Sequence, residues 1–497
     1  MFVQRDPDVL ASFLEDAAHF PGGHASGIAA PSNDAEVADL LRSAASVLPI
    51  GAQSSLTGGA TPMGDVLLST ARLNRILEIG SDWARVQAGV TLAELDAALA
   101  AADKYYPPAP TFTGAFVGGT VATNAAGAAT FKYGTTRDWV HAITVVFASG
   151  AVRRIERGHA QASSLVPVPT YRMPAVPKNS AGYFAAPDMD LIDLFIGSEG
   201  TLGVVTEVTL RVLPHRPALC YAFVTFDDRM AALALVARLR ASSREVGVSA
   251  IEHMDARCLS ILREEGIDRQ FGVPIPSDAA IALLVTLELP TGTTADQAFD
   301  EIGRARDASP SDTPLAVFCR TLDETDVLDR VEIAVPGDFA RATQLVGLRE
   351  AVPAAVNARV GRAKQSIDPR IAKTAADMIV PWDRLGELMN MYDEEFARRG
   401  LDVAVWGHIS DGNLHPNVLP RSYADVESGK ESIMTFGRAV IAMGGSPLAE
   451  HGVGRNPVKQ ALLRELYGER GIEEMRAVKE TLDPAYKLAP GVMFEKR

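Results

Sequence analysis

The chain has 497 residues, of which 47% are hydrophobic and 22% charged, and its formal net charge is −14. A single core seldom extends beyond about 250–300 residues, so this length predicts two or three domains. The acidic balance argues against a protein that binds nucleic acid or an anionic membrane, because both need basic patches. The only thiols are those of Cys220, Cys258 and Cys319, without a CxxC spacing, which excludes a disulfide scaffold and a thiolate zinc site.

Targeting and membrane-spanning segments are not evident in the sequence. No run reaches the roughly 18 apolar residues of a spanning helix. The N-terminus also lacks the basic region followed by an apolar region that marks a secretory signal. We therefore expect a cytoplasmic protein without a transmembrane segment, with peripheral attachment to the inner membrane and assembly as a homodimer left open.

The first part of the chain, to about residue 213, alternates short β-rich runs with Ala-rich helical patterns. We expect strands at 66–70, 84–89 and 139–150, helices at 34–46 and 91–102, and an irregular loop at 159–190. Asp34 and Thr91 stand where N-caps belong, and Glu94 completes a capping box with Thr91. Strands that alternate with helices indicate an α/β domain.

In the following part, from about 218 to 445, the expected strands and helices have a different order and spacing. We expect strands at 221–226 and 281–289, and helices at 230–243 and near 294–306. This order predicts an α+β domain with antiparallel strands. A helix at 457–466 begins the C-terminal segment.

Three glycine-rich segments suggest a binding site for an anion. They read PIGAQSSLTGGATP (49–62), PPAPTFTGAFVGGTVATNAAG (107–127) and GSEGTLGVVTE (197–207). Clustered glycines and small hydroxyl residues let backbone N–H groups approach an anion closely. Neither of the first two is a Walker loop or a clean GxGxxG motif. Together the three favour a diphosphate cradle; the alternative is a set of tight turns, the third leading into a half-buried strand.

A histidine-containing hairpin is the most informative segment, VAVWGHISDGNLHPNVLP at 403–420. Asp411 and Gly412 between two β-rich runs predict a tight turn. The register then places His408 directly opposite His415 on one face, with Cβ atoms about 4.5–5.5 Å apart. Trp406 and Asn417 follow on that face.

The segment AEHGVGR (449–455) supplies further metal-ligand chemistry through Glu450 and His451. Adjacent residues of an extended chain point to opposite sides, so one would ligate a metal while the other faces a substrate. Two histidines and one carboxylate form an open site suited to zinc, manganese or iron(II). The alternative is that His408 and His415 are hydrogen-bonded core residues.

The motifs GSEGTLGVVTE, GHISDGNLHPNV and AEHGVGR, in this order, resemble one family. The chain resembles FAD-binding oxidoreductases of the vanillyl-alcohol-oxidase superfamily, in the branch of glycolate oxidase flavin subunit, D-lactate dehydrogenase and D-2-hydroxyglutarate dehydrogenase. The resemblance covers nearly the whole chain. It implies an α+β architecture, with an FAD-binding domain of two α/β subdomains at 1–215. It further implies an antiparallel α+β cap with the substrate and metal sites at 216–452, and a segment at 453–497 packing back on the FAD domain.

The resemblance also implies roles for individual residues. Residues that match the FAD-binding positions are Gly51, Ala52, Gln53, Ser54, Ser55, Thr57, Gly58, Gly59, Pro110, Thr111, Gly118, Gly119, Thr123, Asn124, Gly127, Glu199, Gly203 and Val204. Residues that match the ligands of a divalent metal (zinc, or else manganese or iron) are His408, His415 and Glu450, with His451 as catalytic base, Arg349 as carboxylate-binding residue and Asn417 as a substrate contact.

The chain departs from the family pattern at several positions. The first loop has fewer glycines than relatives usually have, and the absence of histidine in 51–59 implies a noncovalent flavin. Ala375 stands where some relatives have a substrate-binding lysine, and Lys373 is two residues away. Arg137 and Lys178 are further candidates for flavin or substrate contacts, and the alternative for Arg349 is a charge on a helix surface.

The resemblance implies oxidation of a D-2-hydroxy acid, such as lactate, glycolate or 2-hydroxyglutarate, to the 2-oxo acid. Hydride would pass to FAD, and electrons then to a quinone, a cytochrome, a flavoprotein or O2. The alternatives are a metal-dependent hydrolase, a non-redox flavoprotein of the ether-lipid synthase type, and a noncatalytic protein that binds flavin or metal.

Overall fold

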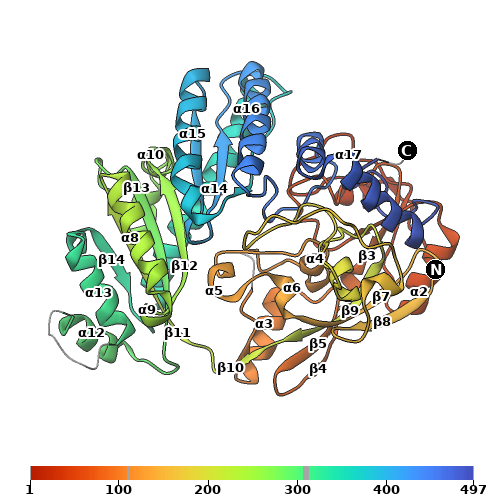
Figure 1. Ribbon diagram of the computed structural model, residues 1–497, viewed down its shortest axis with the longest axis horizontal. Helices are drawn as coiled ribbons and strands as arrows, with labels where there is room; N and C mark the ends of the chain where they lie inside the picture. The colour runs from red at the N-terminus through yellow and green to blue at the C-terminus, as the bar shows by residue number, and fades with distance from the viewer. Residues whose placement is uncertain (1, 109–111, 306–312, 496–497) are drawn as a thin grey trace. The chain divides into compact units, whose positions relative to one another are not determined.

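The chain folds into two compact units, each built around its own sheets (Figure 1). The computed structural model describes residues 2–108, 112–305 and 313–495. The first unit comprises Met1–Gly127, Gly134–His215 and Gly437–Arg497, and the second comprises Ala128–Tyr133 and Arg216–Phe436. The chain therefore returns from the second unit to the first at Gly437, whereas the sequence analysis placed this boundary after residue 452. A Cβ at Gly437 would lie 2.1 Å from Leu462 Cδ2, so this glycine allows the end of one helix to pack closely on the C-terminal helix.

The first unit contains two main sheets. A parallel sheet has the order β1-β3-β2, formed by Gly27–Ala29, Val66–Ser69 and Val47–Ile50. An antiparallel sheet has the order β4-β5-β9-β7-β8, formed by Ile76–Ile79, Trp83–Gln87, Val204–Arg211, Val140–Val146 and Val152–Glu156. A short pair joins β10 (Leu213–Pro214) to β6 (Lys104–Tyr105). The helices include α1 (Pro7–Leu10), α2 (Asp34–Ser43), α3 (Leu92–Ala101), α4 (Val117–Ala122), α6 (Thr136–Trp139), α7 (Leu191–Phe195) and α17 (Pro457–Leu482).

The core of the first unit joins its early strands to the end of the chain. Val47 and Leu68 of the parallel sheet are buried in one cluster with Val146 and with Leu488. Backbone hydrogen bonds reinforce this contact, because the N–H of Val47 donates to the carbonyl of Lys487 at 2.7 Å. The segment that follows α17 is thus part of the core of the first unit.

Most expected elements of this unit form within a few residues of their predicted bounds. The capping box of α3 is confirmed, with the Thr91 side chain accepting from the N–H of Glu94. The N-cap of α2 is Asn33 rather than Asp34, because the Asn33 side chain accepts from the N–H of Glu36 while Asp34 already has helical backbone. Residues 159–190 are irregular apart from one short 3₁₀ turn, Ala162–Ser164, and the single pairing of Gln161 with Asp190.

The second unit is an antiparallel sheet flanked by helices. The strand order is β14-β11-β13-β12-β17-β18-β15, and β16 also pairs with β18. These strands are Val331–Ala334, Ala218–Phe226, Ile281–Leu289, Val248–Asp255, Val403–His408, Asn413–Val418, Thr374–Ala375 and Met378–Ile379. The helices are α5 (Thr130–Tyr133), α8 (Arg229–Ala241), α9 (Ser243–Val246), α10 (Ala256–Glu264), α11 (Ile267–Phe271), α12 (Ala295–Gly303), α13 (Pro314–Glu324), α14 (Phe339–Ser366), α15 (Leu385–Arg399) and α16 (Tyr423–Ala442).

The two faces of this sheet have different neighbours, because side chains alternate along each strand. Met254 and Trp406 point to the face covered by α10 and α14, where they join a buried apolar cluster with Leu348 and Leu259. His253, one residue along β12, points to the other face, which α8 covers (Figure 1). The expected α+β class with an antiparallel second domain is therefore confirmed.

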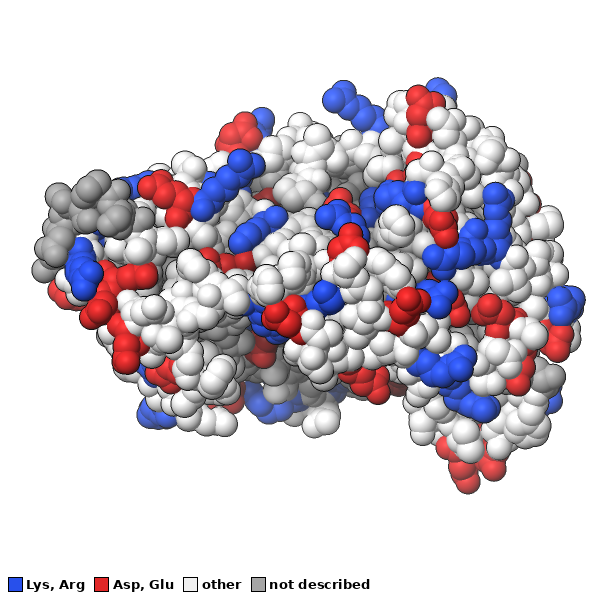
Figure 2. All heavy atoms as spheres, turned by 90° about the horizontal axis from the view of Figure 1, so that it is seen from below, with Lys and Arg blue, Asp and Glu red and all other residues white. Residues whose placement is uncertain are grey.

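Charged side chains of both signs are intermixed over the face drawn in Figure 2, without one sign dominating a large area. Many exposed charged side chains of the protein are ion-paired, including Arg438 with Glu465 and Arg464 with Glu469. Within the described part of the chain, none of the helices combines the length and apolar character that crossing a membrane requires.

Candidate functional site

The first glycine loop, residues 51–59, leaves the end of β2 in the first unit. Gln53 and Gly58 have positive φ values of 51° and 76°, which turn the chain sharply. Gln53 fixes the turn because its amide donates to the carbonyls of Phe13 and Ala60. These two hydrogen bonds connect the start of the loop with its end and with the chain near Phe13.

The second loop leads into α4 and contains two glycines with contrasting surroundings. A Cβ at Gly118 would lie 2.6 Å from the Cβ of Ala88, so this glycine allows close packing on the neighbouring chain. A Cβ at Gly119 would meet no atom of the described residues within 4 Å, so among these residues that side of α4 is open. Thr123 donates to the carbonyl of Gly119, and Asn124 accepts from the N–H of Arg137. The expected FAD-binding residues Pro110 and Thr111 lie outside the described residues.

The third loop joins the first two. The N–H groups of Gly197 and Glu199 donate to the carbonyls of Val121 and Ala122, at 2.9 and 2.8 Å. A Cβ at Gly59 would lie 3.5 Å from Glu199 Oε2, which places the first loop against the third. The tertiary structure therefore brings together three glycine-rich loops that are far apart in the sequence.

The loop 449–455 contacts the third glycine loop. The sequence analysis did not predict this contact. Glu199 accepts hydrogen bonds from the N–H groups of Val453 and Gly454, both at 2.8 Å. Burial raises the pKa of Glu199 to about 7, and these two hydrogen bonds lower it in part. His451, on this loop, is 30% exposed, so its imidazole is accessible beside the glycine loops.

Glu450 on the same loop is buried against Lys178. The Lys178 ammonium lies 3.2 Å from Glu450 Oε2, and the lysine side chain is 0% exposed. A lysine is rarely buried to this degree without a paired charge. Arg137, the other early candidate, is engaged with Asp193 and stacks on Phe184, so its observed contacts are structural.

In the second unit, the hairpin of β17 and β18 has a register different from the one expected. His408 lies opposite Asn413, and His415 lies opposite Trp406. The expectation of a direct His408–His415 pair was wrong because a 3₁₀ turn, Ile409–Asp411, lengthens the connection before Gly412 reverses the chain at φ 83°. The two histidines still share one face, on a diagonal, with ring centroids 5.4 Å apart and planes at 87°.

Both histidines are buried and each has a carboxylate beside Nδ1. His408 Nδ1 donates to Glu252 Oε1 at 2.5 Å, and Asp377 Oδ1 lies 3.4 Å from His415 Nδ1. Metal-ligating histidines commonly donate one ring N–H to such a partner while the other nitrogen ligates. Two imidazoles on one face, each with a carboxylate beside Nδ1, therefore fit the ligands of a metal. A histidine in a purely apolar core would have no carboxylate beside its ring.

Arg349 on α14 is not a surface charge, since its side chain is only 11% exposed. Its Nε donates to Glu252 Oε2 at 2.7 Å, so Glu252 connects Arg349 with His408. Asn417 is also buried, and its amide donates to the carbonyl of His415 at 2.9 Å. Lys373 is exposed.

Glu252 is the main residue that sequence reasoning missed. The sequence does hold a signal, because Glu252 stands between the apolar residues Ile251 and Met254, beside His253, in the strand VSAIEHMD of β12. A carboxylate inside such a strand needs a partner, which a strand pattern alone cannot name.

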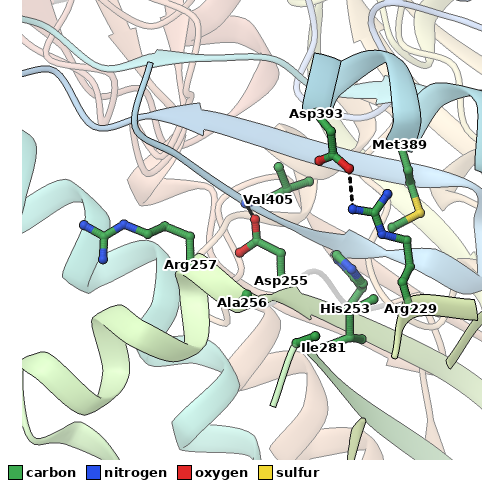
Figure 3. A pocket seen from close by; sticks show the side chains of 10 residues that line it. Arg229, His253, Asp255, Ala256, Arg257, Ile281, Met389, Asp393 and Val405 are labelled. Atoms are coloured by element: carbon green, nitrogen blue, oxygen red, sulfur yellow. Dashed lines mark hydrogen bonds and ion pairs between the residues drawn. The ribbon is translucent and has the colours of Figure 1, made fainter. Parts of the chain in front are cut away.

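A separate pocket of about 340 Å³ lies on the opposite face of the same sheet (Figure 3). His253 points into it, near an ion pair of Arg229 and Asp393. Neither ring nitrogen of His253 has a hydrogen-bond partner among the described residues, and burial lowers its pKa to about 3. Among the described residues, none of the expected site residues lines this pocket.

Comparison with known protein families gives two matches that together span most of the chain. Residues 25–156 match the family described as FAD binding domain, and residues 216–493 match that described as FAD linked oxidases, C-terminal domain. The first match includes the first two glycine loops. The second includes the histidine hairpin, Arg349 and the loop 449–455.

Curated relatives resemble the chain over most of its length. A D-2-hydroxyglutarate dehydrogenase of Xanthomonas citri pv. viticola is 31% identical over 94% of this chain and 89% of its own. The glycolate oxidase subunit GlcD of Bacillus subtilis is 27% identical, with coverage of 94% and 89%. A D-lactate dehydrogenase of Archaeoglobus fulgidus is 30% identical, with coverage of 94% and 90%.

Solved structures share the fold at lower sequence identity. The 4-ethylphenol oxidase of Gulosibacter chungangensis is 18% identical, with a TM-score of 0.65 over 99% of this chain and 94% of its own. An alkyldihydroxyacetonephosphate synthase is 16% identical, with a TM-score of 0.62 over 98% and 82%. These similarities confirm the expected architecture.

Proposed function

Because the chain belongs to the family of FAD-linked oxidases, we propose that it oxidises a D-2-hydroxy acid to the 2-oxo acid with the help of a divalent metal. The observation that carries this proposal is the bonding of the third glycine loop to the loop of Glu450 and His451, through Glu199. A base on that loop is held beside the loops that match an FAD-binding domain.

The glycine loops fit an FAD diphosphate, since small residues leave backbone N–H groups accessible to an anion. The open side of Gly119 is the clearest sign of a cradle that a side chain would fill. We assign the FAD contacts to the expected residues of 51–59, 118–127 and 199–204, and to Pro110 and Thr111. Bound flavin supplies the two-electron chemistry that no amino-acid side chain provides.

We assign the metal ligands to the residues that match the family's ligand positions, His408, His415 and Glu450. Zinc, manganese or iron(II) suits two imidazoles and a carboxylate. A bound cation would lower the pKa of the substrate hydroxyl. His451 then acts as general base and takes up the hydroxyl proton.

We assign the substrate carboxylate to Arg349, whose guanidinium has five N–H donors. Glu252 accepts from Nε and Nη2 of Arg349, which fixes the plane of the guanidinium and balances its charge. The remaining N–H groups then orient the carboxylate, with Asn417 as a further contact.

The test is an anaerobic absorbance titration of the purified protein with glycolate, D-lactate and D-2-hydroxyglutarate, with L-lactate as stereochemical control. We expect an oxidised flavin spectrum that bleaches with one D-acid or with glycolate and stays unchanged with L-lactate. Flavin that bleaches with none of them would contradict the proposed substrate class. A colourless protein after reconstitution would contradict the redox proposal and favour a metal-dependent hydrolase.

The electron acceptor can be identified with the reduced protein from the same titration. We propose a quinone, a cytochrome, a second flavoprotein or O2. Mixing the bleached protein with O2, a soluble quinone or a cytochrome, and following the return of the flavin spectrum, ranks these acceptors by rate.

A further inference from the structure

Glu252 lies at the centre of a buried polar chain in the second unit. Its side chain is 8% exposed, and each of its oxygens has a different partner. Oε1 accepts from His408 Nδ1 at 2.5 Å, and Oε2 accepts from Arg349 Nε at 2.7 Å. Since a carboxylate only accepts, the proton of this bond belongs to His408 Nδ1.

Asp377 has the corresponding place beside the second histidine. Its Oδ1 lies 3.4 Å from His415 Nδ1 and accepts from the amide of Asn413 at 3.1 Å. The carboxylate is buried, at 2% exposure. The same amide of Asn413 also donates to the carbonyl of Met378 at 2.9 Å, which fixes Asn413 beside Asp377.

The two carboxylates favour the same tautomer in both histidines. The hydrogen bond to Glu252 holds the proton of His408 at Nδ1, which leaves the lone pair of a neutral imidazole on Nε2. Asp377 is only at ion-pair distance from His415 Nδ1, 3.4 Å, and its negative charge favours a proton on that nitrogen. Both rings lie on one face of the hairpin with centroids 5.4 Å apart, which places two Nε2 donors in one neighbourhood. His253, the residue after Glu252, shows the contrast with His408, because it is also buried and neither of its ring nitrogens has a hydrogen-bond partner among the described residues.

We propose that Glu252 and Asp377 are positioning residues that fix His408 and His415 as Nε2 ligands of the metal. This inference rests on the proposed metal site and adds the residues that orient its ligands. Glu252 also couples the metal ligand to the substrate-binding Arg349, because a movement of either partner changes the position of the shared carboxylate.

The experiment measures metal affinity in the full-length protein, independently of turnover. Zn²⁺ and Mn²⁺ are titrated against a chromophoric chelator in the wild type, Glu252→Gln and Asp377→Asn. Loss of such a partner typically weakens metal binding about 10–100-fold. We expect a loss in this range for both variants, since each amide keeps the shape of the side chain but not its charge.

Glu288→Gln is the matched control. Glu288 is on the neighbouring strand β13, is also 8% exposed and is paired with Lys132. We expect its metal affinity to equal that of the wild type. A cobalt(II) spectrum of each protein adds a readout of coordination geometry, which a purely structural carboxylate would leave unchanged.

Glu252→Gln also leaves Arg349 without its negative partner, and a second variant separates this effect. The double variant Glu252→Gln/Arg349→Met removes the unbalanced cation. If metal affinity stays low in the double variant, the lost histidine contact is the cause, as we propose. If affinity returns to the wild-type value, repulsion by Arg349 explains the loss and overturns the role of Glu252.

The outcomes distinguish this inference from the proposed function. Wild-type protein that binds neither metal would overturn the metal site itself. Wild-type protein that binds metal, with both single variants within twofold of it, would overturn only the positioning role. Melting temperatures of the metal-free proteins establish that the variants are folded, and Asp377→Asn, which does not touch Arg349, tests the same idea if Glu252→Gln does not fold.

Discussion

The carboxylate of Glu199 accepts a hydrogen bond of 2.8 Å from the N–H of Gly454, 255 residues further along the chain. Val453 donates to the other oxygen of the same carboxylate. One side chain therefore fastens the third glycine loop to the loop that carries the proposed base, His451. The hydrogen bonds of Glu199 therefore connect a loop of proposed flavin contacts with the loop of the proposed base.

Glu199 makes the stability of the protein depend on pH. Burial raises its pKa from 4.5 to about 7, so the folded chain holds this proton more tightly than the unfolded chain. The stabilisation is complete below pH 4.5 and is lost as the pH rises to about 7, by at most about 3 kcal/mol. We expect Glu199→Gln to flatten this slope in urea unfolding of the flavin-free protein, while the exposed control Glu78→Gln keeps it. Equal slopes for wild type and Glu199→Gln would contradict the prediction.

Substitutions of two neighbouring glycines, Gly118 and Gly119, should affect different quantities, the free energy of unfolding and the affinity for FAD. Gly118→Ala places a methyl group 2.6 Å from Ala88, and we expect a loss of about 1–3 kcal/mol in the free energy of unfolding. The methyl group of Gly119→Ala meets no atom of the described residues within 4 Å, so we expect an unaffected fold and a lower FAD affinity. Thermal melting and fluorescence titration with FAD measure the two quantities. Unchanged FAD affinity in Gly119→Ala would show that this open side does not face the flavin.

The buried pair of Lys178 and Glu450 predicts strong coupling between two substitutions. Lys178→Met leaves a carboxylate without its cation, and we expect a loss of about 3–5 kcal/mol in the metal-free protein. The double variant Lys178→Met/Glu450→Gln should recover much of this loss. Denaturant unfolding of the four proteins completes the cycle, and additive effects would show that the two groups are not coupled. Lys132→Met, at a lysine that is 37% exposed, should cost less.

His253 predicts a pH effect of opposite sign to that of Glu199. Burial and the charge of Arg229 lower its pKa from 6.5 to about 3, so the unfolded chain binds this proton more tightly. Stability is therefore lost as the pH falls from 6.5 to about 3, by at most about 5 kcal/mol. We expect His253→Phe to reduce this loss in unfolding experiments at acidic pH. The exposed His159→Phe is the control, and an acid response in His253→Phe equal to the wild type would refute the prediction.

His451 predicts a catalytic effect without a change in cofactor content. General-base catalysis typically contributes about 10²–10⁴-fold to the rate. We expect His451→Gln to lower turnover with the preferred acid by a factor in this range while the flavin spectrum is retained. His159→Gln controls for the loss of an exposed histidine. Near-normal turnover of His451→Gln would remove His451 from its assignment as base.

Much of the local structure can be predicted from short-range signals. The capping box of Thr91 and Glu94 involves residues three apart, and it forms as expected. Gly412 reverses the chain between β17 and β18, as the Asp-Gly pair predicts. The strand 281–289 has the predicted bounds, because an apolar run between turn residues is a local property.

The hairpin register shows where such reasoning ends. The choice between a two-residue turn and the observed 3₁₀ turn decides which residue faces His408, and both turns are compatible with the same sequence pattern. Asn413 also donates to Met378 on β16, and a Cβ at Gly412 would lie 2.4 Å from the carbonyl of Val380. These contacts come from a part of the chain that the hairpin sequence does not contain.

The sequence by itself determined the order of the elements, the glycine loops and the residue types able to bind flavin and metal. Only the tertiary structure decided that Glu252 holds both His408 and Arg349, which are 156 and 97 residues away from it. Backbone propensities and turn preferences act over a few neighbouring residues, whereas the partner of a buried charge is selected by which strands and helices pack side by side. The candidate ligands were therefore visible in the sequence, and the carboxylates that orient them were not.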